Sequence, residues 1–268
     1  AGGTLIDTAR VYGTEAIIGK WVRSRGVRER MVILAKGAHT PDTTPEGIDE
    51  HLADTLSEMQ LDHVDLFVMH RDDPEVPAGE FVDCLNRHLK AGRISAFGGS
   101  NWTIDRLAEA NDYAQRKGLV GFACSSPNLA LARWNRPVWP GCVAASDPAS
   151  LAWYRKTQMP LIAWSSQANG FLAGAFGPDD HRNPDVPDTV RVWLNDANFQ
   201  RLDRARELAQ KKNATLIQIA LAWVLCQPFP TFPLIGPASI DEMRESIGAI
   251  DVPLTPDELD WLMGPPEH

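Results

Sequence analysis

Short apolar runs rich in β-branched and aromatic residues recur along the chain. Seven of them are candidate strands: Thr4–Ile6, Met31–Ala35, Val64–Met69, Ile94–Phe97, Val120–Cys124, Leu161–Trp164 and Phe232–Ile235. Runs this continuously apolar are typical of strands that are covered on both faces, as in parallel sheets. The pattern therefore predicts a parallel sheet inside layers of helices.

Helical patterns lie between these runs. Apolar positions from Ile48 to Met59 repeat at helical spacing after Thr44, a capping residue that is followed by proline. Thr103 can cap another helix, which Gly118 would close. Further helices are expected at Phe199–Leu208, at Leu216–Cys226, and after the capping-box sequences at Ser239 and Thr255. Strands and helices that alternate without a charged linker predict a single α/β domain over residues 1–268.

The number of strands separates two α/β architectures. No GxGxxG turn follows any of the apolar runs, which argues against a Rossmann fold. A (β/α)₈ barrel fits a chain of this length better, but it needs eight strands. The chain opens abruptly on apolar sequence at Ala1 and without a methionine. We therefore expect a barrel with about seven visible strands, whose first β/α unit is absent at the N-terminus.

Two long segments lack any clear periodicity. Residues 132–150 are rich in tryptophan and proline, and residues 177–188 are rich in proline and aspartate. Loops this long in a compact barrel are usually functional or disordered.

Composition narrows the possible partners. Apolar residues make up 44% and charged residues 23% of the chain, as in ordinary globular proteins. A formal net charge of −9 argues against nucleic acid and against an anionic membrane surface as partners. Neither a membrane-spanning run nor a signal peptide is visible. Four widely spaced cysteines predict reduced thiols in a cytoplasmic protein rather than a disulfide framework or zinc site.

Polar residues follow four of the apolar runs. Asp7, Lys36 and His70 follow the first three runs, and Ser100 and Asn101 lie just beyond the fourth. Each would sit near the C-terminal face of a barrel, where the active sites of barrel enzymes lie.

These strand-end residues form a coherent acid–base set with Tyr12, which falls in the loop after Asp7. An unperturbed tyrosine, with a pKa of ~10, is a poor acid at neutral pH, and a nearby ammonium stabilises its phenolate. Lys36 can supply that ammonium, and Asp7 can hold it in place. His70 can donate a hydrogen bond to a substrate carbonyl while Tyr12 protonates its oxygen. Each residue alone is more often structural, so their joint placement carries the prediction.

A family resemblance becomes specific at residues 7–15, which read DTARVYGTE and resemble the DTAxxYGxxE signature of the aldo-keto reductases. Lys36, His70 and the turn at residues 99–102 match further family motifs in the same order, and the similarity extends over nearly the whole chain. The resemblance implies a (β/α)₈ barrel that reduces carbonyls reversibly with NADPH or NADH. It also implies that Tyr12 is the general acid/base.

The same resemblance implies a set of cofactor-binding residues. At the nicotinamide end these are Ser100, Asn101, Ser125 and Trp164. At the pyrophosphate they are Ser165, Gly170, Phe171 and Leu172, and at the adenosine-phosphate end they are Gly236, Ser239, Glu242 and Arg244.

The chain departs from the family pattern at two of these positions. Ser125 stands where the family usually has a longer glutamine. Glu242 stands where many members have arginine or glutamine, and its charge would repel the 2′-phosphate of NADP(H) and favour NAD(H). Two other interpretations stay open: Glu242 can complete a capping box with Ser239, and Arg244 can reach a phosphate.

The substrate is expected to be a small carbonyl compound. Trp102, Trp134 and Trp139 could form an aromatic wall for sugar C–H groups or apolar carbonyls, or they could simply pack a loop onto the barrel. The stretch that starts HRDDP at His70 resembles a bacterial subgroup found beside sugar-processing oxidoreductases, which favours a sugar or polyol carbonyl.

Two other functions compete with a carbonyl reductase. One is a non-catalytic nicotinamide-binding module of the same fold, against which the complete acid–base set argues. The other is a metal-dependent barrel hydrolase that uses Asp7, Asp65 and His70. Only one histidine occupies a strand end, and no HxH pair exists, so we expect no catalytic metal. The pattern leaves the oligomeric state open.

Overall fold

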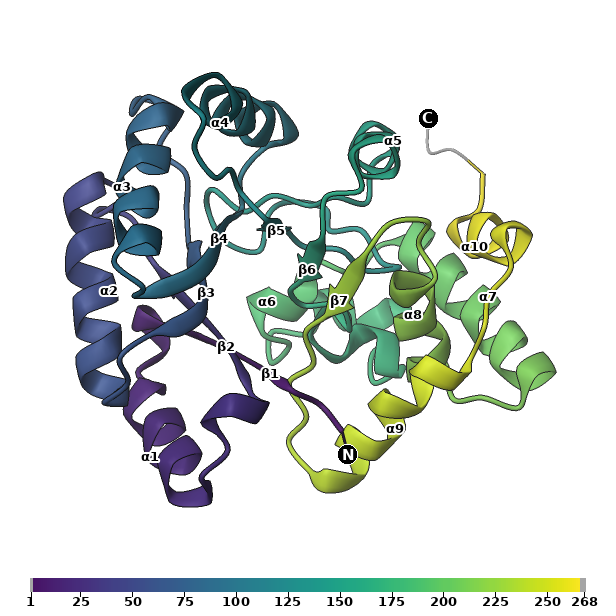
Figure 1. The fold of residues 1–268 in the computed structure, drawn as a ribbon. Helices are drawn as coiled ribbons and strands as arrows, with labels where there is room; N and C mark the ends of the chain where they lie inside the picture. The colour runs from purple at the N-terminus through teal and green to yellow at the C-terminus, as the bar shows by residue number, and fades with distance from the viewer. Residues whose placement is uncertain (1, 266–268) are drawn as a thin grey trace. The chain divides into compact units, whose positions relative to one another are not determined.

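The computed structural model describes residues 2–265, which divide into two compact units (Figure 1). The N-terminal unit comprises Gly2–Ser126, and the C-terminal unit begins at Pro127.

The N-terminal unit is built on a parallel sheet. Its strands are β1 (Leu5–Ala9), β2 (Val32–Gly37), β3 (Val64–Met69), β4 (Ile94–Ser100) and β5 (Cys124–Ser126), and each pairs with the next in chain order. Its helices are α1 (Glu15–Arg25), α2 (Pro45–Met59), α3 (Ala78–Lys90) and α4 (Ile104–Lys117), with short 3₁₀ turns η1 (Arg10–Tyr12) and η2 (Arg28–Arg30). The predicted alternation of parallel strands and helices is confirmed in this unit.

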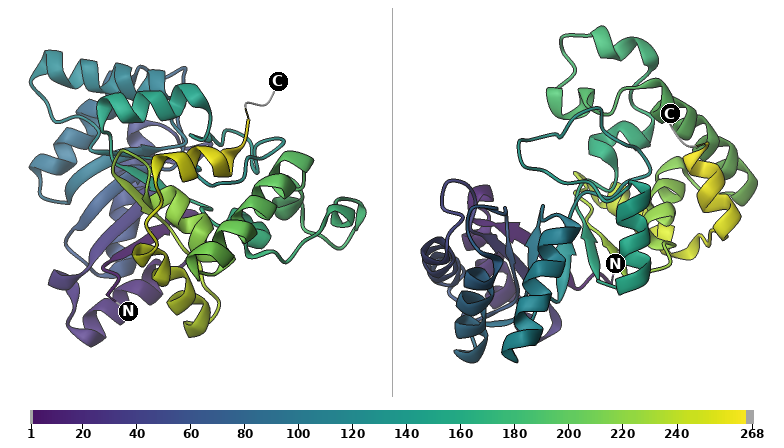
Figure 2. Two further views of the ribbon diagram at one scale, coloured as in Figure 1. Left: turned by 90° about the vertical axis from the view of Figure 1, so that its right-hand side faces the viewer. Right: turned by 90° about the horizontal axis from the view of Figure 1, so that it is seen from above.

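The core of this unit lies between the sheet and its helices. Helices α2 and α3 run along the same face of the sheet (Figures 1 and 2). Leu52 of α2 and Phe81 of α3 are fully buried, as are Ile33 and Phe67 on the central strands. Burying a side chain of this kind stabilises the fold by ~1.5–3 kcal/mol.

The predicted helix starts in this unit are confirmed by their caps. The hydroxyl oxygen of Thr44 accepts a hydrogen bond from the Gly47 amide ahead of α2, and Thr103 accepts one from the Arg106 amide ahead of α4. Gly118 closes α4 in the left-handed conformation.

The fifth strand is shorter and later than predicted. The prediction placed it at residues 120–124, whereas β5 spans Cys124–Ser126. The side chains of two asparagines bond to the backbone ahead of this strand. Asn86 of α3 donates to the Val120 carbonyl and accepts from the Val120 amide, and Asn111 of α4 accepts from the Phe122 amide at 2.7 Å. Because these backbone groups bond to helices, they do not enter the strand ladder.

The C-terminal unit contains two parallel strands, β6 (Leu161–Ala163) and β7 (Thr231–Pro233). Its helices are α5 (Pro148–Thr157), α6 (Asp188–Arg191), α7 (Asp196–Lys212), α8 (Leu216–Leu225), α9 (Ile240–Ile247) and α10 (Pro256–Met263), and its 3₁₀ segments are η3 (Ala168–Ala173), η4 (Pro178–Arg182) and η5 (Gly248–Asp251). Helix α8 is apolar on almost every side and mostly buried, and it contacts β7 and α7. It is the central element of this unit's core.

The long segment 132–150 is irregular, as predicted, until α5 begins at Pro148. It is anchored by the buried Asn198 of α7, which accepts from the Arg133 amide at 2.9 Å and donates to the Arg133 carbonyl at 2.6 Å. These bonds replace regular secondary structure, because they satisfy the backbone of a segment without apolar periodicity.

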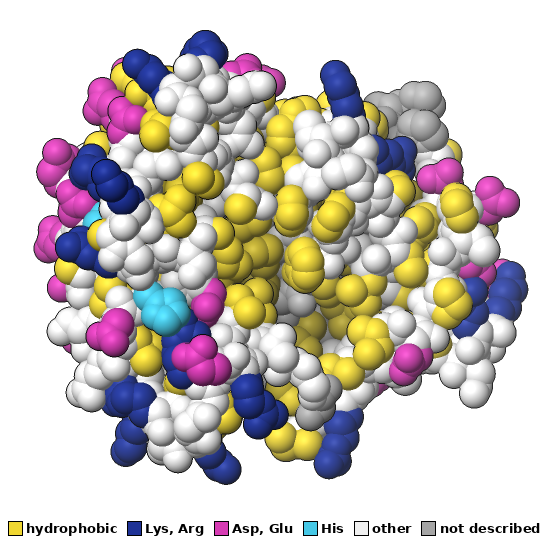
Figure 3. All heavy atoms as spheres, in the orientation of Figure 1, with side chains coloured by type: hydrophobic (Ala, Val, Ile, Leu, Met, Phe, Trp, Pro, Cys, Tyr) yellow, Lys and Arg dark blue, Asp and Glu magenta, His cyan; other side chains and the backbone are white. Residues whose placement is uncertain are grey.

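The surface of the described part of the chain carries mixed charge. Figure 3 shows Lys and Arg interspersed with Asp and Glu over α1 to α3, on the left of the view. Among residues 2–265, no helix is both long and apolar enough to cross a membrane.

Candidate active site

Three of the four predicted catalytic residues share one face of the N-terminal sheet. Lys36 on β2 stands opposite Ala9 on β1 and opposite Val68 on β3. Side chains alternate along a strand, so Asp7 and His70, each two residues from one of these partners, project to the same face as Lys36. Asp7 and Lys36 lie within β1 and β2, which are longer than predicted, and His70 follows β3 directly, as predicted.

The side chains of these residues meet around Lys36. Its ammonium forms an ion pair with the Asp7 carboxylate and lies 5.4 Å from the centre of the Tyr12 ring. The Tyr12 ring stands at right angles to the His70 ring, with 5.7 Å between their centres. The structure therefore brings together all four residues of the predicted acid–base set.

Burial controls the charge states of Lys36 and Asp7. The Lys36 side chain is almost completely buried, which lowers its pKa, while the neighbouring Asp7 carboxylate acts in the opposite direction. Burial also raises the pKa of Asp7, and the Lys36 ammonium opposes that rise. Each group therefore depends on the other to stay charged in this environment.

His70 is held in its neutral form. Burial, followed by the positive charges of Lys36 and Arg71, lowers its pKa to about 2. Its Nδ1 atom is buried and has no hydrogen-bond partner among the described residues. A proton on Nδ1 would be a buried donor without an acceptor, so the single ring proton is best assigned to Nε2. His70 is then a hydrogen-bond donor through Nε2.

The turn that carries Tyr12 is clamped at its base. Tyr12 ends η1, and Gly13 closes that turn in the left-handed conformation. Behind it, the buried Glu15 forms an ion pair with Arg10 and accepts a 2.6 Å hydrogen bond from the Thr55 hydroxyl. The Tyr12 side chain itself is 51% exposed. A firmly held backbone thus presents an accessible phenol.

Ser100 and Asn101 lie at the end of β4 and are both buried. The Ser100 hydroxyl donates to the Ser126 carbonyl at 2.8 Å. Asn101 adopts a left-handed conformation (φ 60°), and its amide nitrogen donates to the His70 carbonyl at 3.4 Å and to Ser100 Oγ at 3.1 Å. Asn101 therefore links the end of β4 to His70, whose ring is the predicted hydrogen-bond donor to the substrate carbonyl.

Two further predicted residues of this unit are packed inside it. Trp102 is 1% exposed, donates from its indole nitrogen to the Arg71 carbonyl at 3.2 Å, and packs against Phe81 and Phe122. This geometry favours the packing interpretation of Trp102 over a place in a substrate wall. Ser125 is also buried, on β5 opposite Gly99.

His39, which was not among the predicted site residues, lies beside His70. The rings of His39 and His70 meet edge to face, with 4.9 Å between their centres. The signal that could have found it is its position three residues after Lys36, where the chain leaves β2.

The metal-site alternative is not supported by the position of Asp65. Its carboxylate accepts from the Ile33 amide at 2.7 Å and pairs with Arg28 at 3.0 Å. Among the described residues, Asp65 forms no potential ligand group with Asp7 and His70.

The predicted tryptophans of the C-terminal unit form a cluster. Trp164, directly after β6, lies 5.5 Å from Trp134 and 6.1 Å from Trp139 between ring centres, and Trp193 extends the cluster behind Trp134. Trp139 is half exposed, and the buried indole nitrogen of Trp164 has no partner among the described residues. The cluster therefore offers aromatic surface and one free donor.

Residues 165–172 form an unusual turn after Trp164. Ser165, Asn169 and Gly170 all have positive φ, and the Ser165 hydroxyl donates to the Asn169 side chain at 3.0 Å. Phe171 and Leu172 are fully buried, so their side chains pack inside the C-terminal unit. The backbone amides of Gly170 and Leu172 both donate to the Gln167 carbonyl, at 3.3 and 3.4 Å, and these bonds close the turn.

A cavity of about 250 Å³ lies beside this turn, within the C-terminal unit. Its lining residues are Gln167, Gly170, Ala173, Leu216, Ile217, Gly236, Pro237, Glu242, Glu245 and Ser246. Three of these, Gly170, Gly236 and Glu242, were predicted to bind cofactor, whereas Gln167, Glu245 and Ser246 were missed. The position of Glu245 three residues after Glu242 on a predicted helix could have indicated that both face one side.

The structure settles the local roles of the α9 residues. Ser239 caps α9 by accepting from the Glu242 amide, as predicted. The Glu242 carboxylate accepts instead from the Ala238 amide at 2.8 Å, so the predicted bond from the Ser239 amide, which would complete the capping box, is not formed. Arg244 is largely exposed, pairs with Asp241 at 3.2 Å, and does not line the cavity.

Comparison with known proteins identifies one family over almost the whole chain. The profile of the Aldo/keto reductase family matches residues 1–263. An uncharacterized oxidoreductase of Bacillus subtilis, YrpG, is 27% identical over 97% of this chain and 82% of its own length. The aldo-keto reductase str7 of Strobilurus tenacellus is 29% identical over 97% of this chain and 76% of its own length.

A solved structure supports the fold independently. The crystal structure of a thermostable aldo-keto reductase in complex with the inhibitor epalrestat aligns with a TM-score of 0.70 at 24% identity, over 96% of this chain and 80% of that chain. This similarity confirms the predicted barrel-type α/β fold. With the family profile spanning almost every residue, the chain belongs to the aldo/keto reductase family of oxidoreductases.

Proposed function

We propose that this protein reduces an aldehyde or ketone to an alcohol with a nicotinamide cofactor, and that Tyr12 is the general acid/base. The observation that carries the proposal is the contact of the Asp7–Lys36 ion pair with the Tyr12 ring, next to a neutral His70. This arrangement combines a proton donor, a charge that stabilises its conjugate base, and a hydrogen-bond donor for a carbonyl oxygen.

Each side chain has a separate task in the reduction. When bound, a nicotinamide cofactor would supply the hydride for the carbonyl carbon. His70 donates from Nε2 to the carbonyl oxygen and orients it, and Tyr12 gives that oxygen its phenolic proton. Lys36 stabilises the resulting phenolate, and Asp7 keeps Lys36 charged although it is buried. In the reverse direction, the Tyr12 phenolate accepts the proton from the alcohol.

The residues present fit a nicotinamide dinucleotide. In the N-terminal unit, Ser100, Asn101 and Ser125 are the residues proposed for the nicotinamide carboxamide. In the C-terminal unit, Trp164 is the residue proposed to stack on a nicotinamide ring. Ser165 and the segment 170–172 would approach the pyrophosphate, with Gly170 on the lining of the cavity. At the 250 Å³ cavity, a Cβ added to Gly170 or Gly236 would meet nothing within 4 Å, so both backbones are open to a ligand.

We further infer a preference for NADH. Glu242 and Glu245 both line the cavity, whereas Arg244 points its charge to Asp241 outside it. Two carboxylates repel a 2′-phosphate and can accept hydrogen bonds from free ribose hydroxyls.

For the substrate, we propose a sugar or polyol carbonyl. Trp134 and Trp139 supply the aromatic surface for sugar C–H groups, and the exposure of Trp139 supports contact with a ligand. Trp102 is left out of this wall because it is buried against Phe81 and Phe122.

The test is a fluorescence titration of the purified chain with NADH and NADPH, followed by a panel of carbonyl substrates. Cofactor binding and oxidation are expected, and Tyr12→Phe should lower turnover by roughly 10²–10⁴-fold. Tyr113→Phe is the matched control, since the Tyr113 hydroxyl bonds Asp83 on the surface, away from these residues. Equal activity of Tyr12→Phe and the natural chain would overturn the assignment of Tyr12.

The same experiment separates the non-catalytic alternative. A nicotinamide-binding module would bind cofactor tightly but transfer no hydride to any carbonyl in the panel. The complete set of Asp7, Tyr12, Lys36 and His70 favours the reductase.

A further inference from the structure

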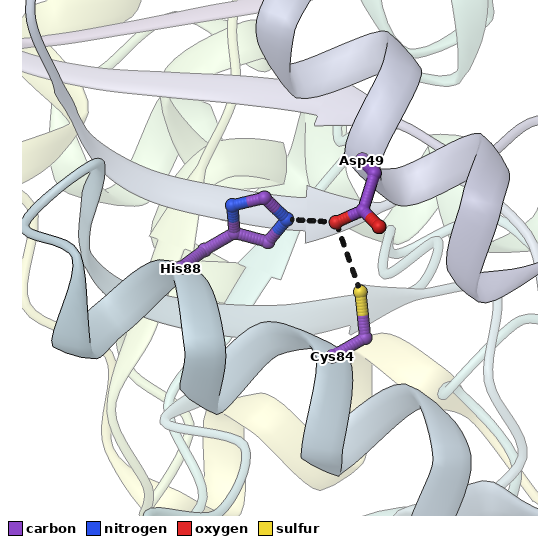
Figure 4. Close-up of side chains that lie close together, drawn as sticks. All are labelled: Asp49, Cys84 and His88. Atoms are coloured by element: carbon purple, nitrogen blue, oxygen red, sulfur yellow. Dashed lines mark hydrogen bonds and ion pairs between the residues drawn. The ribbon is translucent and has the colours of Figure 1, made fainter.

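A group of potential metal ligands lies between two helices of the N-terminal unit, apart from the residues assigned to carbonyl reduction. Asp49 comes from α2, and Cys84 and His88 come from α3 (Figure 4). Their ligand atoms all lie within 4.8 Å of one another. His88 Nε2 is 2.6 Å and Cys84 Sγ is 3.6 Å from the same Asp49 oxygen, Oδ1.

The spacing along α3 explains why two of these ligands meet. Residues four apart on a helix lie one above the other on the same face, so Cys84 and His88 both project towards α2. Both are buried, while the Asp49 carboxylate is half exposed. The group therefore has a fixed inner part and one side open to solvent.

A Cys–His–Asp group can also be a nucleophilic triad, but this one has the wrong order of contacts. In a triad the thiol bonds the histidine, whereas the Cys84 thiol donates to Asp49 and to the Pro45 carbonyl. Burial and the Asp49 charge raise the pKa of Cys84 to about 12. A thiol of this kind is a poor nucleophile.

We propose that Asp49, Cys84 and His88 form a binding site for a zinc-class divalent cation that joins α2 to α3. The ligand set carries the choice of metal. Sulfur, imidazole nitrogen and carboxylate oxygen are the three ligand types of protein zinc sites, whereas Mg²⁺ and Ca²⁺ bind oxygen. A water molecule would complete a tetrahedral site from the open side.

Binding would exchange hydrogen bonds for metal bonds. The Cys84 thiol loses its proton to solvent and binds as thiolate, His88 binds through the neutral Nε2, and Asp49 binds through Oδ1. One proton is released from the thiol for each metal ion bound. The three donor atoms must spread only slightly, because a tetrahedral site needs Zn–S of about 2.3 Å and Zn–N of about 2.0 Å.

Two arginines lie beside the ligand group, and their positive charges lower its affinity for a cation. Arg93 lies 3.3 Å from His88 Nδ1, and Arg87 lies 3.3 Å from Asp49 Oδ2. Zinc-bound histidines normally donate from this outer nitrogen to an acceptor, so the Arg93 guanidinium is a poor neighbour for the metal-bound form. Both arginines are exposed and free to turn into solvent when a metal binds.

The test is a Co²⁺ titration of the full chain followed by absorption, with displacement of Co²⁺ by Zn²⁺. One equivalent should give a thiolate-to-cobalt charge-transfer band together with the intense visible bands of tetrahedral cobalt, and Zn²⁺ should remove both. Cys84→Ser should abolish the charge-transfer band, and Asp49→Asn should weaken binding by roughly 10-fold or more. Arg93→Ala should tighten it.

Cys226→Ser is the matched control, since Cys226 is a hydrogen-bonded thiol outside the group and its loss should leave the cobalt spectrum unchanged. Asp49 is on the surface, so Asp49→Asn is expected to fold, which circular dichroism of each variant verifies. The proposal is overturned if the natural chain gives no charge-transfer band, or if the band persists in Cys84→Ser.

Discussion

The ammonium nitrogen of Lys36 lies 5.4 Å from the centre of the Tyr12 ring while it is ion-paired with Asp7. One buried cation therefore serves two partners, a carboxylate that compensates its charge and a phenol that it can activate. The first contact supports stability, and in the proposed reaction the second supports proton supply. Mutations can therefore separate the two.

We expect Lys36→Met to lower both stability and turnover. The variant leaves Asp7 largely buried without its partner, which should cost about 3 kcal/mol of unfolding free energy, since breaking a buried pair costs ~3–5 kcal/mol. In the double variant Asp7→Asn/Lys36→Met, stability should largely return but turnover should not. Urea unfolding and steady-state kinetics measure the two effects. Recovery of turnover in the double variant would contradict the role of Lys36.

The low pKa of His70 predicts a pH-dependent stability. An unfolded histidine titrates near ~6.5, and His70 in the folded chain titrates at about 2. Between these values the unfolded state binds more protons, so the unfolding free energy should fall as the pH falls below ~6.5. One such group contributes at most about 1.4 kcal/mol per pH unit. Chemical unfolding at pH values from neutral to mildly acidic gives the slope.

His70→Asn should reduce that slope, because the substituted side chain does not titrate. His181→Asn provides a comparison, since His181 lies exposed on η4, outside the buried acid–base set. An undiminished slope in His70→Asn would mean that other groups, such as the buried His88, carry the acid sensitivity.

The acidic lining of the cavity predicts a change of cofactor preference on neutralisation. Glu242→Gln/Glu245→Gln should raise affinity for NADPH relative to NADH by roughly 10-fold or more, because ~1.4 kcal/mol of repulsion corresponds to a factor of ten. Asp241→Asn neutralises an adjacent carboxylate that does not line the cavity and should change the ratio little. Fluorescence titration with both cofactors measures the ratio. Equal shifts in both variants would point to net charge rather than to the cavity.

Much of the fold is visible in the sequence because its strands are apolar on both faces and its helices carry explicit caps. The apolar runs at β2 and β3 and the caps at Thr44 and Thr103 mark their elements within a few residues. The predicted position of β5 was wrong, because where this strand begins depends on bonds from Asn86 and Asn111, which come from two helices distant in the sequence. Such tertiary competition leaves no local signal.

The same distinction between local sequence signals and tertiary contacts holds for the candidate site. Asp7, Lys36 and His70 could be predicted because each lies at or near the end of a strand, where parallel register brings them together. For Trp102 the sequence left a substrate wall and packing both open, and its contacts with Phe81 and Phe122 favour packing. Gln167 and Ser246 line the cavity from separate elements, joined by a 2.9 Å hydrogen bond, and this pairing is set only by the folded chain.

The close approach of β4 and β5 predicts a severe effect of Gly98→Ala. An added Cβ at Gly98 would lie 2.3 Å from the Cys124 carbonyl oxygen, a backbone atom that cannot move without disturbing the β4–β5 ladder. We expect a loss of roughly 3 kcal/mol, at the upper end of overpacking costs, measured by urea unfolding. Gly3→Ala is the control, because a Cβ there meets nothing within 4 Å. Equal stability of the two variants would contradict this close approach of β4 and β5, and with it the position of Ser125 on β5.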